Sequence, residues 1–117
     1  PVAFTWAIGG FRVVKEAGPF GAQHAEYQIV ASFGEQVWAV WVRFSAFGRF
    51  VDVVKHHSHY KKTLKAWARV KREQRMWRCL DVSYLKVKCL LLEDFLRLAL
   101  FDAGSPAHLL YLLGVHC

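Results

Sequence analysis

The chain has 117 residues, of which 55% are hydrophobic and 15% aromatic. This composition supplies the apolar material for one domain core and excludes an intrinsically disordered chain. The three cysteines include no CxxC pair, which favours reduced thiols and argues against a disulfide framework. The first residue is Pro rather than Met, so we expect a single domain over residues 1–117 that is a segment of a longer protein.

The first third of the chain predicts two strands. An apolar run from Val2 to Ile8, the Gly9-Gly10 pair and the sequence FRVVKEA together predict one strand over residues 1–17, broken or bulged at the glycines. A Gly-Pro-Phe-Gly loop follows. Apolar residues then alternate with polar ones from about His24 to Phe33, which predicts a second strand, and Gly34-Glu35 forms a hairpin turn into the third.

The sequence VWAVWVRFSAFGRFVDVV, residues 37–54, changes its periodicity at a polar corner. Its first half alternates as a strand with apolar residues on both faces, and Arg43 ends that strand. From Ser45, predicted as an N-cap, apolar residues recur every three or four positions, which is the period of a helix that faces the core. An Arg and a Phe therefore stand side by side at a strand-to-helix corner.

Helical patterns occupy the rest of the chain. Residues 61–78 form either a weakly amphipathic helix, with Leu64, Trp67, Val70 and Gln74 on one stripe, or a loop with a helical turn. A clear helix follows Asp81, its predicted N-cap, and residues 105–113 predict a short fourth helix. Strands first and helices afterwards indicate an α+β fold, a three-stranded antiparallel sheet packed on one side against three to four helices.

The charge is concentrated in one segment. The net charge is +7; residues 55–78 carry nine Lys or Arg and one acid, a net +8, while the remaining residues carry −1. Such a segment predicts an anionic membrane or a nucleic acid as partner, although a solvated helix face is the commonest role of such runs. Trp67, Met76 and Trp77 are interleaved with the charges, as membrane-interface or base-stacking residues would be, unless the tryptophans belong to the core.

The sequence offers little for catalysis. It contains no GxGxxG, Walker or GxSxG motif, and its acids are scattered, so we expect neither an enzyme nor a cofactor. The His56-His57-Ser58-His59 cluster lacks the spacing of a metal site and favours a polar turn. The apolar stretch Tyr84–Phe101 is interrupted by five charged residues, which argues against a membrane span.

Arg43 and Phe44 suit a phosphorylated ring ligand. A guanidinium grips a phosphate through two parallel hydrogen bonds, and an aromatic ring packs against the C–H face of a sugar-like ring. Both side chains reach one pocket only if the chain bends between them. The alternative is that Phe44 belongs to the core and that Arg43 is a solvated or ion-paired strand end.

From about Phe11 to Leu113 the sequence resembles the phox-homology (PX) domain, a phosphoinositide-binding module. Arg43-Phe44-Ser45-Ala46-Phe47 is similar to the family's Arg-(Tyr/Phe)-x-x-Phe signature at the end of the third strand. LLLEDFLRLAL, residues 90–100, is similar to the Leu-rich helix near the end of PX domains, and AHLLYLLG follows it as in the family.

The resemblance implies roles for single residues. Arg43 would bind the 3-phosphate of phosphatidylinositol 3-phosphate, with Phe44 beneath the inositol ring. The family's second Arg, which contacts inositol hydroxyls, corresponds to Lys88, a departure that keeps the charge but loses the planar fork. A basic residue for the 1-phosphate would be one of three candidates: Lys71, Arg72 and Arg75.

The family's proline-rich membrane loop has no counterpart, because no Pro occurs between Pro19 and Pro106. Trp67 or the Met76-Trp77 pair would take over membrane insertion. We therefore expect a non-enzymatic, cytoplasmic module that attaches peripherally to endosomal or other phosphoinositide-bearing membranes. The alternatives are a PX-like protein-interaction module with a decayed lipid pocket and, less in keeping with these motifs, a nucleic-acid-binding domain.

Overall fold

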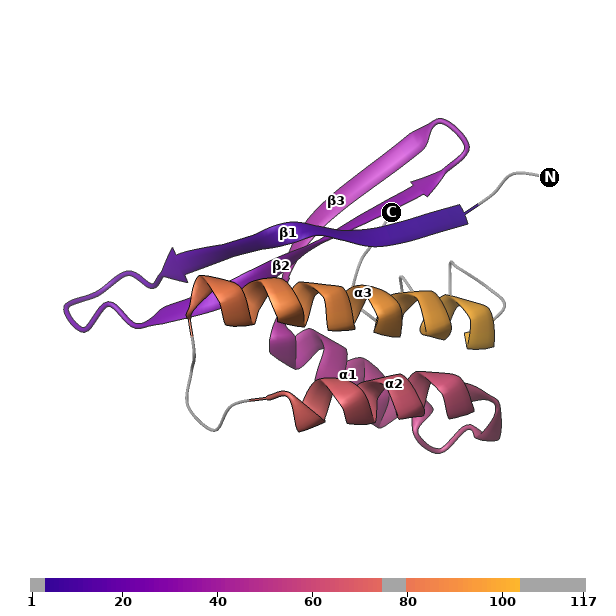
Figure 1. Ribbon diagram of the computed structural model, residues 1–117. Helices are drawn as coiled ribbons and strands as arrows, with labels where there is room; N and C mark the ends of the chain where they lie inside the picture. The colour runs from indigo at the N-terminus through magenta and orange to yellow at the C-terminus, as the bar shows by residue number, and fades with distance from the viewer. Residues whose placement is uncertain (1–3, 75–79, 104–117) are drawn as a thin grey trace.

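The computed structural model describes residues 4–74 and 80–103. Figure 1 shows a twisted antiparallel sheet on one side of α3, with α1 and α2 beyond it. The strands pair in the order β1-β2-β3, so the α+β prediction of a three-stranded antiparallel sheet followed by helices is confirmed. The predicted fourth helix, residues 105–113, lies outside the described residues. The elements are β1 (Phe4–Lys15), β2 (Gln23–Phe33), β3 (Gln36–Arg43), α1 (Phe44–Val54), a 3₁₀ turn (Ser58–Tyr60), α2 (Lys61–Arg72) and α3 (Val82–Ala103).

The predicted irregularity of β1 is a β-bulge. The pairing of β1 with β2 shifts register between Ile8 and Gly10. Because side chains alternate between the two faces of a strand, the extra residue brings Phe11 to the same face as Ile8. A Cβ on Gly9 would lie 2.9 Å from a methyl carbon of Val30 and 2.6 Å from the side-chain oxygen of Gln28, so a side chain at this position would displace those two neighbours.

The core lies between the inner face of the sheet and the helices. Phe95 of α3 is fully buried, and its ring contacts the rings of Phe47 and Phe50 edge-on at centroid distances of 6.3 and 6.0 Å. The indole Nε1 of Trp6 in β1 donates a hydrogen bond of 2.7 Å to the carbonyl oxygen of Leu96, which ties the sheet to α3. The other large side chains that are fully buried are Tyr27, Ile29, Val54, Val70, Leu85, Leu92 and Leu96.

The sequence predicted N-cap residues for α1 and α3, and the structure confirms only the second. Helix α1 begins at Phe44 with Arg43 as an extended N-cap residue (φ −79°, ψ 159°), so the prediction of Ser45 as N-cap is wrong. The helix begins two residues earlier than predicted because Phe44 packs toward the helices, where its ring stacks on Trp67. Ser45 instead accepts a hydrogen bond from Arg49 at 3.4 Å. The cap at Asp81 is confirmed, because its Oδ1 accepts a hydrogen bond of 3.1 Å from the Tyr84 amide.

Helix α2 settles the choice between helix and loop for residues 61–72. Its buried residues are Thr63, Ala66 and Val70, so the inward stripe is rotated from the predicted one. The first turn contains no acid, but Asp102 of α3 approaches it. Oδ2 of Asp102 accepts hydrogen bonds of 2.8 Å from both the amide and the hydroxyl of Thr63. A carboxylate from another helix thereby meets the positive end of the α2 dipole.

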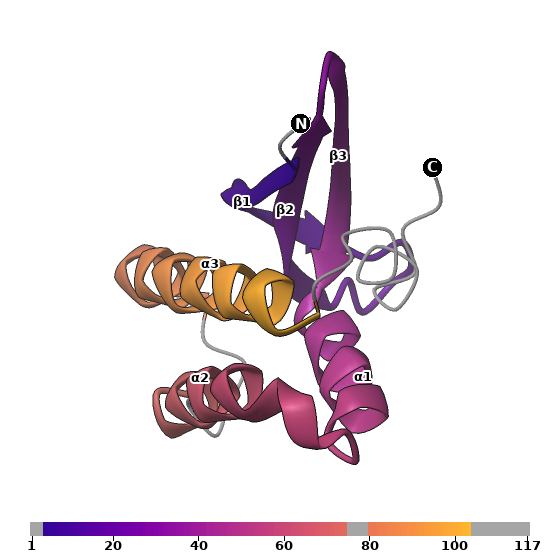
Figure 2. The same cartoon turned by 90° about the vertical axis from the view of Figure 1, so that its right-hand side faces the viewer.

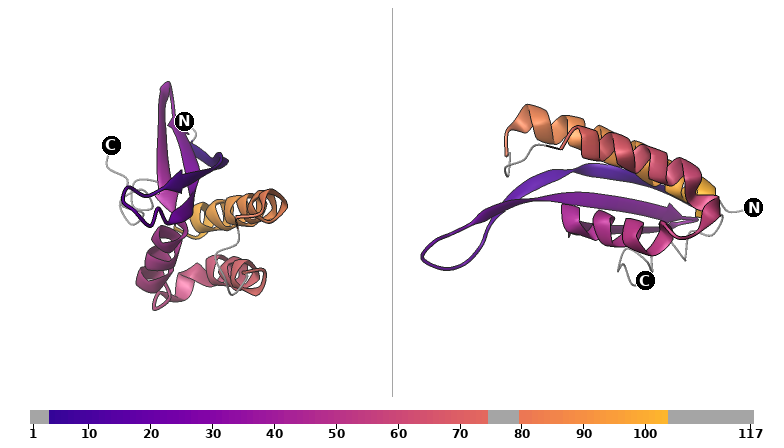
Figure 3. Two further views of the ribbon diagram at one scale, coloured as in Figure 1. Left: turned by 90° about the vertical axis from the view of Figure 1, so that its left-hand side faces the viewer. Right: turned by 90° about the horizontal axis from the view of Figure 1, so that it is seen from below.

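The two hairpins leave the helical layer in different directions. The turn between β1 and β2 protrudes at the end of the molecule where α2 ends and α3 begins (Figure 1 and the right panel of Figure 3). The β2–β3 hairpin stands away from the three helices (Figure 2). None of the helices in residues 4–74 and 80–103 has the length and apolar character needed to cross a bilayer.

Candidate headgroup pocket

Phe44 and Lys88, two of the residues predicted from the sequence, lie together. The ammonium nitrogen of Lys88 is 3.7 Å from the centroid of the Phe44 ring and 5.4 Å from that of Tyr84. The Phe44 ring also stacks on Trp67, with centroids 5.3 Å apart and planes 20° apart. Cation–π attraction and stacking therefore hold the half-buried lysine at the junction of α1, α2 and α3.

A pocket opens beside Lys88, between the last turn of α2 and the first turns of α3. Lys88 contributes the cation of its lining and Glu73 the carboxylate, while Ser83 and Tyr84 carry hydroxyl groups. Three aliphatic side chains complete the wall: Val70, Val87 and Leu91. Such a wall combines apolar surface with a few polar groups of both signs, as sites for small polar ring molecules do.

Arg43 lies on the opposite side of the sheet from this pocket. It stands opposite Glu26 in the register of β2 and β3, whereas its neighbour Val42 stands opposite the buried Tyr27. Its guanidinium lies 3.7 Å from a carboxylate oxygen of Glu16. An ion-paired strand end was one of the two alternatives for Arg43, and it is the arrangement observed. Its predicted phosphate contact stays a prediction.

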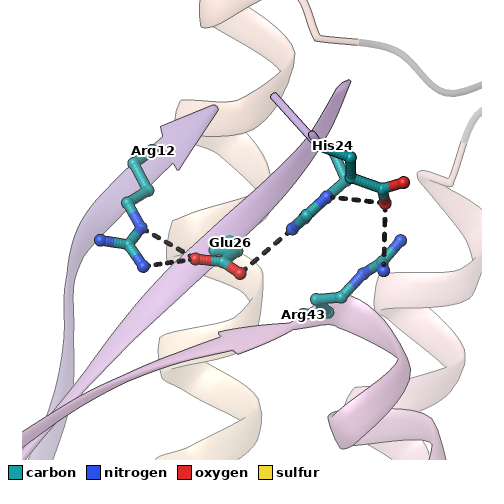
Figure 4. Close-up of polar contacts among 5 residues, drawn as sticks. Arg12, His24, Glu26 and Arg43 are labelled. Atoms are coloured by element: carbon teal, nitrogen blue, oxygen red, sulfur yellow. Dashed lines mark hydrogen bonds and ion pairs between the residues drawn. The ribbon is translucent and has the colours of Figure 1, made fainter. Parts of the chain in front are cut away.

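A chain of ionic contacts crosses the outer face of the sheet, and Figure 4 shows Arg12, Glu26, His24 and Arg43 along it. Arg12 contacts Glu26 at 2.7 Å, and His24 contacts Glu26 at 3.1 Å. The other ring nitrogen of His24 lies 3.4 Å from Glu16. The hydrogen bond from His24 and, after it, that from Arg12 lower the pKa of Glu26 below its ordinary value of 4.5.

The basic residues of α2 form an exposed face. Arg69 pairs with Asp94 at 3.4 Å, and the ammonium of Lys62 lies 4.2 Å from the centroid of the Phe101 ring. Lys71 and Arg72 are exposed near the pocket end of the helix. The remaining members of this face are Lys61 and Lys65. Of the predicted residues, Arg75, Met76 and Trp77 lie outside the described residues.

Trp67 takes part in the packing of the helices. Its ring lies 5.3 Å from the centroids of both Phe44 and Phe95, and the residue is half-buried. This is the core role that the sequence left open for the tryptophans. The membrane contact proposed for Trp67 would therefore require its ring to leave two aromatic partners.

Sequence reasoning missed Phe20 as a candidate functional residue. It lies in the turn between β1 and β2, and its side chain is 96% exposed. Gly18 and Gly21 on either side adopt positive φ angles of 120° and 43°. The sequence signal was the phenylalanine within Gly-Pro-Phe-Gly, because a turn of this composition lies on the surface and exposes its side chains.

Neither a metal site nor a reactive thiol has support among the described residues. Within residues 4–74 and 80–103, His, Cys, Asp and Glu nowhere gather in a group of three that could hold a metal ion. Burial and the nearby charge of Glu93 raise the pKa of Cys89 to about 11. This thiol therefore keeps its proton at neutral pH, which disfavours a nucleophilic role.

Comparison with known proteins leaves the family open. No protein-family model matches the chain, and no curated protein matches its sequence. The likeness to PX domains therefore rests on the signature at Arg43 and Phe44 and on the pattern of α3.

Proposed function

We propose that this chain is a non-catalytic module of PX type that binds a phosphoinositide headgroup, with phosphatidylinositol 3-phosphate as the first candidate. The observation that carries the proposal is the position of Lys88, held against the Phe44 ring beside a pocket of mixed polarity. The expected location is the cytoplasmic surface of endosomal or other phosphoinositide-bearing membranes, and protein partners are compatible with it.

The pocket lining matches the parts of such a headgroup. The ammonium of Lys88 supplies charge for a phosphate, although as a point charge it lacks the two-pronged grip of Arg. Tyr84 offers an aromatic face to the C–H groups of an inositol ring, whereas the Phe44 ring already stacks on Trp67 and carries the Lys88 ammonium over its face. The hydroxyl of Ser83 and the carboxylate of Glu73 are available to ring hydroxyl groups, and Glu73 opposes the entry of additional phosphates.

The end of the molecule that carries the pocket suits a membrane surface. Lys71 and Arg72 are exposed there, and each basic residue close to an anionic leaflet contributes about 1 kcal/mol of attraction. The β1–β2 turn, which contains Phe20, protrudes from the same end (Figure 3). A fully exposed aromatic residue at that position can enter the interfacial layer while the basic residues contact lipid phosphates.

The decisive experiment is co-sedimentation of the chain with liposomes that carry each phosphoinositide in turn, at physiological salt. Lys88→Ala is compared with Lys86→Ala, a matched control because Lys86 is exposed on the same helix and is not among the residues that line the pocket. We expect the native chain and Lys86→Ala to prefer one headgroup and Lys88→Ala to lose that preference.

Arg43→Ala tests the predicted phosphate contact of Arg43 separately from that of Lys88. A loss of headgroup preference in this variant would show that Arg43 leaves Glu16 and turns to the ligand. Equal binding of all variants to every anionic liposome would overturn the pocket. Binding to nucleic acid in preference to liposomes, with an affinity that falls steeply as salt rises, would favour the basic face of α2 as a nucleic-acid site.

A further inference from the structure

The two edges of the sheet differ in how they are protected. The β1 edge carries the bulge at Gly9-Gly10 and two cations, Arg12 and Lys15, which are features that discourage pairing with another strand. In β3, residues 37–42 are all apolar, without a charge or a proline. Within the described part of the chain, β3 pairs only with β2.

The unprotected edge is accessible in the first half of β3. The β2–β3 hairpin stands away from the helices (Figure 2), and the Val37 side chain is 66% exposed. Ala39 is also exposed, and Trp38 and Trp41 are only half-buried. An apolar edge of this kind presents backbone donors and acceptors together with apolar side chains to a second strand.

We propose that β3 pairs with β3 of a second copy of this chain, antiparallel about a two-fold axis at Ala39. Residues opposite each other in an antiparallel pair share a face of the sheet. Pairing about Ala39 places Val37 opposite Trp41 of the second copy and Trp38 opposite its Val40. Aromatic residues opposite β-branched ones are favourable cross-strand pairs, and the small Ala39 meets itself at the axis.

Charge complementarity favours this register and favours a second copy of the chain as the partner. The same pairing places Glu35, an exposed residue of the turn just before β3, next to Arg43 of the second copy at both ends of the interface. The register centred on Val40 would instead place Arg43 opposite Val37 and leave Glu35 without its basic partner. The strand is therefore complementary to itself, as a two-fold interface requires, and the product is a continuous six-stranded sheet.

Sedimentation equilibrium over a wide range of protein concentration tests the dimer. Ala39→Lys places two ammonium groups directly opposite each other, and we expect at least a tenfold increase in the dimer dissociation constant. Ala7→Lys is the matched control, because Ala7 occupies the same cross-strand row on the β1 edge and pairs through Val30 with Ala39. This control is expected to leave the dimer unchanged.

A charge exchange tests the register without changing the strand interior. Glu35→Arg and Arg43→Glu are each expected to weaken the dimer, because they place like charges opposite each other, and the double variant is expected to restore it. Failure of the double variant to recover the dissociation constant would overturn the proposed register.

Disulfide trapping gives an independent readout if a charged variant fails to fold. Ala39→Cys is expected to cross-link two copies on mild oxidation, because identical residues face each other at the axis. Val37→Cys is not, because the two residues 37 would lie about 13 Å apart along the strands, beyond the reach of a disulfide of roughly 7 Å. A monomer at all concentrations without the Ala39→Cys cross-link would overturn the proposal.

Discussion

The ammonium of Lys88 lies 3.7 Å from the centroid of the Phe44 ring. This contact joins the first residue of α1 to the second turn of α3, and the stacking of Phe44 on Trp67 adds α2 to the same cluster. The Phe44 ring therefore contacts residues of α2 and α3 and orients the Lys88 ammonium, which we propose binds the headgroup. The packing of the three helices therefore fixes the position of Lys88 beside the pocket.

Replacing Lys88 with Arg should strengthen headgroup binding several-fold. A guanidinium retains the cation–π contact with Phe44 and adds a planar fork for phosphate or hydroxyl oxygens. The dissociation constant of a soluble inositol bisphosphate, measured by titration calorimetry, gives the answer, with Lys86→Arg as control. Weaker binding of Lys88→Arg would indicate that the fit of the ammonium among the aromatic rings outweighs its contact with the ligand.

Replacing Glu73 with Gln should also strengthen binding of the same ligand. The substitution removes the negative charge from the pocket lining and keeps a side chain of similar shape. The gain should shrink as salt is added, because Glu73 is exposed and its repulsion is screened. Asp52→Asn in α1 makes the same change of charge away from the pocket and should leave the dissociation constant unaltered.

Replacing Asp102 with Ala should lower the free energy of unfolding by about 2 kcal/mol. Both the amide and the hydroxyl of the fully buried Thr63 lose their acceptor in this variant. Urea denaturation measures the change, and Asp52→Ala, at an exposed residue on α1, should change stability by less than about 0.5 kcal/mol. An equal loss in both variants would argue against Asp102 as the partner of the α2 N-terminus.

The contacts of Glu26 should make stability depend on acidity. Its pKa is lowered in the folded chain, so its contribution to stability is present above pH 4.5 and is lost as the pH falls through the lower folded value. Glu26→Gln should therefore be less stable than the native chain near neutral pH, and the difference should narrow in acid. Urea midpoints measured at intervals between neutral and strongly acidic pH test this, and a constant difference would contradict it.

The sequence predicted the elements whose signals are local. Alternation located β2 and β3, the paired glycines marked the bulge, and Asp81 was correctly identified as a cap. Helix α2 was ambiguous because its inward residues include Thr63 and Ala66, which carry little hydrophobic signal and are buried through contacts with α3. Ser45 failed as a cap because the packing of Phe44 on Trp67, a tertiary contact, set where α1 begins.

The candidate site was also predictable only in part, because some of its residues belong to a local motif and others are brought together only by tertiary packing. The motif resemblance grouped Phe44 with Lys88, and the fold brings them together. The direction of Arg43 was not visible in its own neighbourhood, because it depends on Glu16, which is far away in the sequence and follows β1 at the same end of the sheet. The pocket wall from Val70 to Leu91 needed the relative placement of α2 and α3, which no local pattern encodes.

The bulge in β1 means that this strand carries one residue more than its pairing needs. Five residues of β1 lie on one face of the sheet: Phe4, Trp6 and Ile8 before the bulge, and Phe11 and Val13 after it. The first three have even numbers and the last two have odd numbers, and the extra residue of the bulge keeps all five on the same face. A chain that lacked Gly9 would show an unbroken alternation and could form a regular strand with the same residues inward. Deletion of this glycine should therefore be tolerated, whereas deletion of Ala7 would place Trp6 and Ile8 on opposite faces of a regular strand. The length of β1, normally among the most constrained properties of a buried strand, is here open to change at a single position.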